Sequence, residues 1–282
     1  MSKNMKRMLT GYGLVLPSFL VVMLVVTWPI LTAMKTSFTD PDTGGFTLDN
    51  YKYFFETPRE LTNILFTLFV VVVTVALAII IAYMLALYLR FVKSKISRWI
   101  GNLYLLPRFV PGMVAVYAMI TVIRDSGLLN RISQLFGGDF KPGMMYQASG
   151  MITMNLWFNI PFAALMITAG LGAIPDSMIE SARDVGASKL RVFRSMILPL
   201  SIKDVVIAAT FVFMSNVGSF TTPYLMGGNY PKMLGIVLFD QFNKYLRYER
   251  AAAMSFIIFL ICSVSAGVYI YTNLREKEWE KG

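Results

Sequence analysis

The 282-residue sequence has no histidine and only one cysteine, and charged residues make up just 15% of it. Without histidine, the chain lacks the commonest general base and the commonest ligand for transition metals. The single cysteine, Cys262, excludes a disulfide within the chain, and its apolar neighbours argue against a reactive thiol. The sequence also lacks a G-x-x-x-x-G-K-[ST] motif, whose backbone amides and lysine would hold nucleotide phosphates. Histidine-based catalysis and nucleotide hydrolysis by this chain are therefore not expected.

Apolar residues are abundant instead, at 56% of the chain, and they come in long blocks. A helix needs about 20 mostly apolar residues to cross the hydrocarbon core of a bilayer. The long runs with few or no charges therefore predict an all-α integral membrane protein with about six transmembrane helices in one domain, residues 1–282. The expected spans are Gly11–Met34, Ile64–Leu89, Ile100–Ile123, Tyr146–Leu171, Val205–Tyr224 and Ala251–Leu274.

The net charge of +10 would suggest nucleic acid as a partner for a soluble protein. Here the basic residues collect in loops, as they do on the cytoplasmic side of membrane proteins. A cytoplasmic amino terminus places 15 basic residues inside and 10 outside, and the loop Arg90–Arg98 holds four with no acidic residue. We therefore expect both termini in the cytoplasm, the lipid bilayer as a partner, and no nucleic acid. The first span is too long for a signal peptide and lacks a clear cleavage site, so we expect it to remain uncleaved.

The longest inner loop, Gly172–Asp204, predicts two short helices joined by a turn. Asp176 or Ser177 is placed to cap the first helix, with Glu180 three or four residues further on for a capping box. Gly186 is placed to end that helix or to make a tight corner.

Helical spacing gives each of these helices an expected apolar face. The first face consists of Met178, Ala182 and Val185, and the second, within about Ser188–Ile197, consists of Leu190, Phe193 and Ile197. The basic residues Lys189, Arg191 and Arg194 lie mostly off the second face. Such a segment suits either an anionic lipid surface or a protein docking surface, and the pattern alone favours neither.

The same loop resembles the cytoplasmic EAA motif of the permease subunits of binding-protein-dependent ATP-binding-cassette (ABC) importers. That motif reads Glu-Ala-Ala, three residues, Gly-Ala, then Phe, and finally Ile-x-Leu-Pro. The matching residues are Glu180, Ala182, Gly186, Ala187, Phe193, Leu198 and Pro199. Ser181 replaces the first alanine, Met196 stands at the isoleucine position, and Lys203 stands where many members have a second proline. Further similar segments, Asn50-Tyr51, Leu106-Pro107 and Gly127-Leu128-Leu129-Asn130, extend the resemblance over nearly the whole chain.

The resemblance implies the type I importer permease fold, also called MetI-like, with residues 176–199 as cytoplasmic coupling helices. The coupling residues would be Glu180, Ser181, Ala182, Asp184, Gly186, Ala187, Phe193, Leu198 and Pro199. It implies a bacterial cytoplasmic membrane location and a non-catalytic subunit that binds no cofactor, because a partner uses the ATP and Mg²⁺. The implied partners are two ATPase subunits, a second permease and an extracytoplasmic substrate-binding protein. A different chain is expected as the second permease, and a homodimer is the alternative.

Residues 218–228, with 233–235 and 240–242, resemble the branch of this family that serves polyamines such as spermidine and putrescine. Iron(III), aminoalkylphosphonates and thiamine, the substrates of near relatives, are the alternatives. The candidate substrate-path residues are Arg108, Phe220, Thr221 and Asp240. The outer acidic residues Asp49, Glu56, Asp240 and Glu249 either attract a polycation or are ordinary solvated charges.

Arg108 is the one charged residue within an expected span. If Arg108 lines the transport path, it favours an anionic solute. Alternatively, Arg108 is structural, and its side chain extends toward the cytoplasmic end of the span or forms an ion pair there. Two other classes of membrane protein predict different residues. An ion-coupled secondary transporter predicts several acidic residues within the spans, and none lies in the six expected ranges. A membrane enzyme would need clustered histidine or acidic residues.

Overall fold

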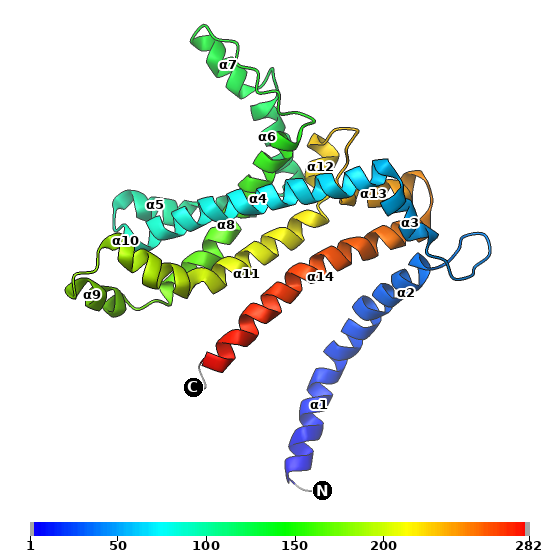
Figure 1. Ribbon diagram of the computed structural model, residues 1–282, viewed down its shortest axis with the longest axis horizontal. Coiled ribbons are helices and arrows are strands. Elements are labelled where there is room, and N and C mark those ends of the chain that lie inside the picture. The colour runs from blue at the N-terminus through cyan, green and yellow to red at the C-terminus, as the bar shows by residue number, and fades with distance from the viewer. Residues whose placement is uncertain (1–2, 280–282) are drawn as a thin grey trace. The chain divides into compact units, whose positions relative to one another are not determined.

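The computed structural model describes residues 3–279, and the side chains of residues 12–272. This part of the chain is helical and contains no strand, apart from an isolated β-bridge between Thr39 and Phe46. The segments, most of them labelled in Figure 1, are α1 (Lys3–Val21), η1 (Val22–Thr27), α2 (Trp28–Ser37), α3 (Asp49–Glu56), α4 (Pro58–Phe91), α5 (Lys95–Leu103), η2 (Leu106–Phe109), α6 (Gly112–Ile123), α7 (Leu128–Leu135), α8 (Ala148–Gly172), α9 (Asp176–Asp184), α10 (Lys189–Val192), η3 (Phe193–Ile197), α11 (Leu198–Val217), α12 (Thr221–Met226), α13 (Leu234–Phe239), η4 (Asp240–Lys244) and α14 (Tyr248–Trp279). The segments η1, η3 and η4 are π-helical, and η2 is a 3-10 helix.

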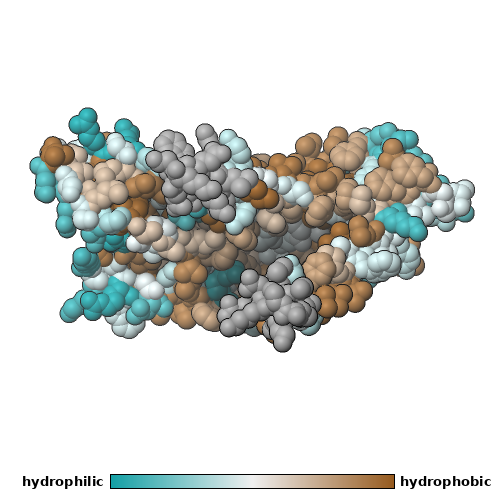
Figure 2. Space-filling model, turned by 90° about the horizontal axis from the view of Figure 1, so that it is seen from below, coloured by the Kyte–Doolittle hydropathy of each residue, from teal (hydrophilic) through white to brown (hydrophobic). Residues whose placement is uncertain are grey.

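Six helical stretches among the described residues are long and apolar enough to cross a membrane, which confirms the expected number. They are Tyr12–Ser37, Pro58–Phe91, Gly112–Leu135, Ala148–Gly172, Lys189–Val217 and Tyr248–Thr272. Many large apolar side chains on these stretches are exposed, and hydrophobic surface covers much of the face in Figure 2. Such surface needs lipid or a partner subunit to cover it.

The expected third span, Ile100–Ile123, is not one continuous helix. α5 ends at Leu103, the 3-10 turn η2 follows, and α6 begins only at Gly112. Pro107 and Pro111 explain the breaks, because proline has no N–H to donate and its ring crowds the preceding turn.

The expected fifth span, Val205–Tyr224, begins earlier and ends sooner than predicted. α10, η3 and α11 follow one another without a break, so the apolar stretch runs over Lys189–Val217. Pro199 does not stop it, since it lies in the first turn of α11, where a missing N–H is tolerated. The longer stretch includes Asp204, so the expectation of acid-free spans is wrong at this position.

The described contacts divide the chain, expected as one domain, into two compact units. One comprises Met1–Glu60 and Leu238–Phe259, and the other comprises Leu61–Val237 and Leu260–Gly282. The basic residues expected at the termini, including Lys3 and Lys281, have side chains outside the described part.

In the first unit, α3 is joined to the end of α2 by polar contacts. Asn50 Nδ2 donates to the carbonyl oxygens of Ser37 and Thr39, both at 3.0 Å, and the hydroxyls of Ser37 and Tyr51 are 2.6 Å apart. Because the last carbonyls of a helix have no partner within it, Asn50 supplies donors that α2 needs. The Asn50-Tyr51 pair thus has a structural role at this helix end.

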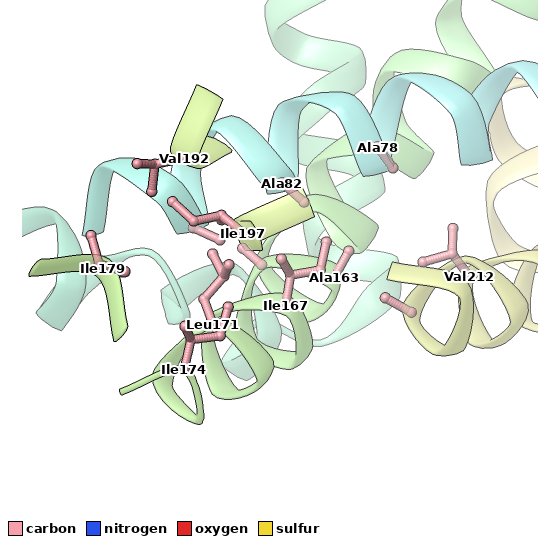
Figure 3. Close-up of a cluster of buried hydrophobic side chains, with 13 residues drawn as sticks. Ala78, Ala82, Ala163, Ile167, Leu171, Ile174, Ile179, Val192, Ile197 and Val212 are labelled. Atoms are coloured by element: carbon pink, nitrogen blue, oxygen red, sulfur yellow. The ribbon is translucent and has the colours of Figure 1, made fainter. Parts of the chain in front are cut away.

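The core of the second unit is formed by small and branched apolar residues from α4, α8, the loop after α8, and α11. Ala78, Ala82 and Ala86 lie four residues apart on one face of α4, and all three are fully buried. Ile167 and Leu171 of α8 belong to the same buried cluster (Figure 3). Small residues let helices approach closely. Close packing holds helices together inside a membrane, where lipid tails and the neighbouring helix are both apolar.

A buried polar cluster joins α8 to α11 further along these helices. Asn159 Nδ2 lies 3.4 Å from Asn216 Oδ1, and Ser215 Oγ lies 3.4 Å from Asn159 Oδ1. Asn159 and Asn216 are 7% and 3% exposed. Side-chain hydrogen bonds across helices add to packing inside a membrane and fix which faces meet.

The loop after α12 is held by side chains of α4. Asn63 Oδ1 accepts from the backbone N–H of Lys232 at 2.7 Å, and Thr67 Oγ1 accepts from Leu234 at 3.0 Å. Gly235 lies so close to the backbone oxygen of Ser219 that a Cβ would clash with it. The loop 227–233 and the start of α13 are therefore anchored to the second span.

Candidate functional site: the elbow between the fourth and fifth spans

Residues 176–199 form two short helices at a sharp corner, and we call this segment the elbow. α9 ends at Asp184 with Val185 as its C-cap, and Gly186 follows with φ +84°, in the left-handed region. The N–H of Gly186 donates to Arg183 O at 2.8 Å, and the N–H of Ala187 donates to Ala182 O at 3.0 Å. This pair of bonds is a Schellman motif, which places glycine at the left-handed position. The prediction that Gly186 turns the chain is confirmed.

The second helix of the elbow is capped by a side chain, whereas the first is not. Ser188 Oγ accepts from the N–H of Arg191 at 3.3 Å at the start of α10. Pro175 occupies the cap position of α9 without a side-chain bond, so the predicted cap at Asp176 or Ser177 is wrong. Asp176 is instead the first residue of the helix, where a carboxylate is still favoured by the helix dipole.

Arg90, at the end of α4, holds the start of the elbow. Its Nη2 donates to Asp176 Oδ1 at 2.6 Å and to Ile174 O at 3.1 Å, and its Nε donates to Leu171 O at 3.3 Å. One guanidinium therefore satisfies carbonyl oxygens at and just beyond the end of α8 and pairs with the carboxylate that begins α9.

Tyr83, seven residues before Arg90 and so on the same face of α4, holds the other end of the elbow. Its hydroxyl lies 2.8 Å from Ser201 Oγ, which donates to Ile197 O at 2.7 Å. Because the Ser201 proton is used in that bond, Tyr83 is the donor to Ser201. The Tyr83 ring also meets Phe193 edge to face, with centroids 6.2 Å apart. Both arms of the elbow are thus braced against one helix.

The inward face of α9 differs from the predicted one. Ile179 is 5% exposed and Ala182 is half-buried, whereas Val185 is 85% exposed and Met178 is 39% exposed. Met178 and Ile179 are adjacent apolar residues, so spacing alone could not choose between two neighbouring faces. The contact with the core selects Ile179.

The inward face of the second arm is also shifted. Val192 and Ile197 are buried, Phe193 is half-buried, and Leu190 is 57% exposed. The predicted face of Leu190, Phe193 and Ile197 assumed α-helical spacing throughout. The π-helical segment η3 inserts an extra residue per turn and so brings Val192 and Ile197, five apart, to the same side.

The expected coupling residues fall into two groups in the structure. Exposed ones are Glu180, Ser181, Asp184, Gly186, Leu198 and Pro199. Half-buried ones, packed against the core of the second unit, are Ala182, Ala187 and Phe193. Sequence reasoning missed the exposed apolar tip formed by Val185 and Leu190, because it assigned both to inward faces. The exposure of Val185 could have been predicted from its position directly before the corner glycine.

Arg108 lies in η2, and its guanidinium carbon is 5.0 Å from the centre of the Phe162 ring on α8. Phe162 in turn meets Phe211 of α11 edge to face, at 6.2 Å. A cation over an aromatic face is attracted by the ring quadrupole. This geometry gives Arg108 a packing role against α8.

The other candidate path residues are divided between the two compact units. Phe220 precedes α12 and stacks on Tyr224, with ring centroids 4.9 Å apart, and Thr221 is the first residue of α12. Asp240 begins η4, which belongs to the other compact unit.

Asp49, one of the acidic residues expected to attract a polycation, pairs with a lysine. Lys52 Nζ lies 3.1 Å from Asp49 Oδ1, and this hydrogen bond holds the pKa of Asp49 below its usual range. Because the carboxylate is already paired, it is less suited to attracting a cationic solute.

A cavity of about 1250 Å³ opens between α8, α11 and α14 near the elbow. Its polar lining includes Lys203, Asp204 and Tyr271, and Gly170 lies on its α8 side. The side chain of Asp204 rests on Gly170, where any Cβ would collide with it.

Six candidate spans, with a braced elbow between the fourth and fifth, are the architecture of a multi-pass membrane protein. The chain belongs to the family described as binding-protein-dependent transport system inner membrane component, which it matches over residues 77–278. It has the MetI-like fold, and it is a multi-pass permease subunit of an ABC importer in the inner membrane.

Curated relatives include the spermidine/putrescine transport system permease protein PotB of Escherichia coli (strain K12). The two are 25% identical over 254 residues, which cover 88% of this chain and 92% of PotB. The thiamine transport system permease protein ThiP of Brucella suis biovar 1 (strain 1330) is 28% identical over 157 residues, which cover 55% of this chain and 28% of ThiP.

Solved structures share the fold at low identity. A chain of the bacterial alginate ABC transporter, in complex with an alginate pentasaccharide-bound periplasmic protein, matches with a TM-score of 0.82 and 17% identity over 98% of this chain and 96% of that chain. A chain of the inward-facing MetNI methionine ABC transporter matches with a TM-score of 0.57 and 18% identity over 80% of this chain and 99% of that chain.

Proposed function

We propose that this chain carries a polyamine such as spermidine or putrescine across the cytoplasmic membrane. The observation that supports this most is the similarity to the spermidine/putrescine permease, which extends over nearly the full length of both proteins. Polyamines are flexible cations, and the stacked rings of Phe220 and Tyr224 offer aromatic faces of the kind that attract ammonium groups. In this proposal Phe220 and Thr221 line the path, and Arg108 is structural.

The proposed assembly contains two ATPase subunits, a second permease of different sequence and an extracytoplasmic binding protein that delivers the solute. ATP and Mg²⁺ bind to the ATPases, because this chain has no phosphate-binding loop of its own. Both termini and the elbow face the cytoplasm, in agreement with the basic loop Arg90–Arg98.

The elbow is the proposed point of force transfer. Its exposed side, with Glu180, Asp184 and Gly186, contacts the ATPase, while Ala182, Ala187 and Phe193 attach it to the core. Closing of the ATPases then moves α4 through Arg90 and Tyr83. It moves the fifth span directly, because α10, η3 and α11 are continuous through Leu198 and Pro199. The spans rock to open the path outward and then inward.

The decisive test is uptake into proteoliposomes that contain this chain, its co-purified subunits and the cognate binding protein. We expect ATP-dependent uptake of labelled spermidine that excess putrescine inhibits and that thiamine, an iron(III) chelate and 2-aminoethylphosphonate do not. Uptake of one of the last three in place of spermidine would reassign the solute and leave the importer intact.

The elbow is tested separately in the same system. We expect Glu180→Ala to reduce uptake at unchanged abundance of the chain. If no ATPase co-purifies in mild detergent and Glu180→Ala leaves uptake intact, the proposed coupling is wrong.

A further inference from the structure

The short helix α5 has three distinct faces. Its inward face contains Ser97, which is 6% exposed, and Gly101, which lies against Leu89 of α4. Tyr104, one turn further on, packs against the core cluster of the second unit. This face fixes α5 against the end of the second span.

The second face is apolar and exposed. Ile96 is 66% exposed, Trp99 is 68% exposed and Leu103 is 44% exposed. Their spacing of three and four residues aligns them along one side of the helix. With Ile100 they line an open hollow of about 370 Å³, whose rim includes Lys95.

The third face is basic. Lys95 and Arg98 are exposed on it, and Lys93 is exposed in the turn just before the helix. The sequence contains no acidic residue between Glu60 and Asp125, so this charge has no acidic neighbour along the chain. A helix with an exposed apolar stripe beside a basic edge is typical of segments that lie in the interface of an anionic membrane.

The position of α5 selects lipid over a protein groove as the occupant. Only three residues, Val92–Ser94, separate it from the end of α4, the second candidate span, so we expect α5 near the membrane surface. The cytoplasmic leaflet carries anionic headgroups that attract basic residues near a span. Trp99 has the amphipathic ring that is enriched at this depth.

We propose that α5 binds an anionic phospholipid of the cytoplasmic leaflet. Lys93, Lys95 and Arg98 contact the phosphate, and an acyl chain lies in the hollow along Trp99 and Leu103. The proposal rests on the proposed function only for the orientation that puts α5 on the cytoplasmic side, and it is independent of the solute.

Trp99 is itself the probe for a test in nanodiscs that contain the co-purified assembly. Tryptophan fluorescence is measured with phosphatidylglycerol or phosphatidylcholine brominated on the acyl chains. The difference between the wild-type and Trp99→Phe assemblies isolates the signal of Trp99. We expect brominated phosphatidylglycerol to quench this signal at roughly tenfold lower mole fraction than brominated phosphatidylcholine.

The triple variant Lys93→Gln, Lys95→Gln, Arg98→Gln should abolish the preference between the two lipids. The matched control is the triple variant Arg131→Gln, Lys141→Gln, Lys244→Gln. It removes three exposed charges from segments that a cytoplasmic amino terminus places outside, and it should retain the preference for phosphatidylglycerol. Equal quenching by both lipids, unchanged in the triple variant, would overturn the headgroup site. Absence of quenching would show that protein covers this face, and would overturn the proposal entirely. Spermidine uptake is measured on the same assemblies, so failure of the polyamine assignment is seen separately.

Discussion

At the scale of single residues, the corner of the elbow depends on one backbone angle. Gly186 has φ +84°, yet open space surrounds the position that a Cβ would occupy. A substitution there is therefore strained by the backbone alone and not by a clash. A residue with a Cβ in the left-handed region costs roughly 1–2 kcal/mol.

We expect Gly186→Ala to reduce spermidine uptake severalfold, because the corner relaxes and misplaces both arms of the elbow. The measurement is uptake per molecule of chain in the membrane, with thermal stability of the detergent-solubilised assembly alongside. Gly172→Ala is the matched control, since Gly172 also faces open space but has no positive φ. An equal loss of uptake in both variants would show that the positive φ of Gly186 is not the cause.

Val185 lies where a contact with the ATPase can be tested separately from the stability of the chain. It is 85% exposed at the tip of the elbow, so a charge there should cost this chain little stability on its own. If the tip enters an apolar groove on the ATPase, Val185→Asp should lower ATPase co-purification about tenfold or more. Leu135→Asp introduces the same charge at an 82% exposed position of α7 and should have no such effect. Normal recovery of the ATPase with Val185→Asp would exclude the tip from the contact.

At the scale of elements, Arg90 makes two kinds of contact whose contributions to stability differ. It forms an ion pair with Asp176, and it caps the end of α8 by donating to carbonyl oxygens. The Asp176 side chain is 59% exposed, so the pair itself contributes only about 0–1 kcal/mol. The bond from Arg90 to Ile174 O matters more, since an unsatisfied buried group costs about 1–3 kcal/mol. Leu171 O also accepts from the N–H of Ile174 at 3.3 Å and so keeps a partner.

Arg90→Met should therefore impair uptake strongly, whereas Asp176→Asn, which keeps an acceptor oxygen, should be nearly neutral. ATP hydrolysis by the assembly is measured with uptake, because loss of the brace should leave hydrolysis running without transport. If Asp176→Asn proves as damaging as Arg90→Met, the ion pair and not the cap is essential.

The close approach of α8 and α11 at Gly170 gives a second prediction about elements. Gly170→Ala should push Asp204 aside and destabilise the chain, because a Cβ would meet the carboxylate. Adding Asp204→Ala should restore stability by making room, so the two effects should be non-additive. Thermal unfolding of the detergent-solubilised assembly for both single variants and the double variant measures this. Additive losses would mean that the contact does not govern the packing.

At the scale of the whole molecule, the spans differ greatly in how much this chain buries them. The most apolar window of Ala148–Gly172 is 50% buried, whereas that of Tyr12–Ser37 is 0% buried. Helices in a membrane are held by packing with neighbours, so the first span requires lipid or another subunit.

We expect the first span to be cut by protease in detergent when the chain is purified alone, and to be protected when the second permease is co-expressed. Limited proteolysis with mass spectrometry of the fragments measures this, and the span Ala148–Gly172 is the internal control because the chain itself buries it. Equal cleavage in both preparations would show that the second permease does not cover the first span.

Much of this molecule was predictable from local sequence. Six apolar runs indicate six spans because length and hydropathy suffice to place a helix in a bilayer. Gly186 indicates a corner because glycine alone adopts a positive φ freely. The interruption of the third span could be anticipated from Pro107 and Pro111 but was missed, because hydropathy does not register breaks in a helix.

The sequence by itself determined the number of spans, the family and the position of the elbow, since each depends on residues that are close along the chain. Only the tertiary structure decided that Ile179 and not Met178 faces inward, that Arg90 pairs with Asp176, and that Asp204 rests on Gly170. The physical reason is that these outcomes depend on which helices lie side by side. Arg90 and Asp176 are 86 residues apart in sequence, and no local pattern indicates that they meet.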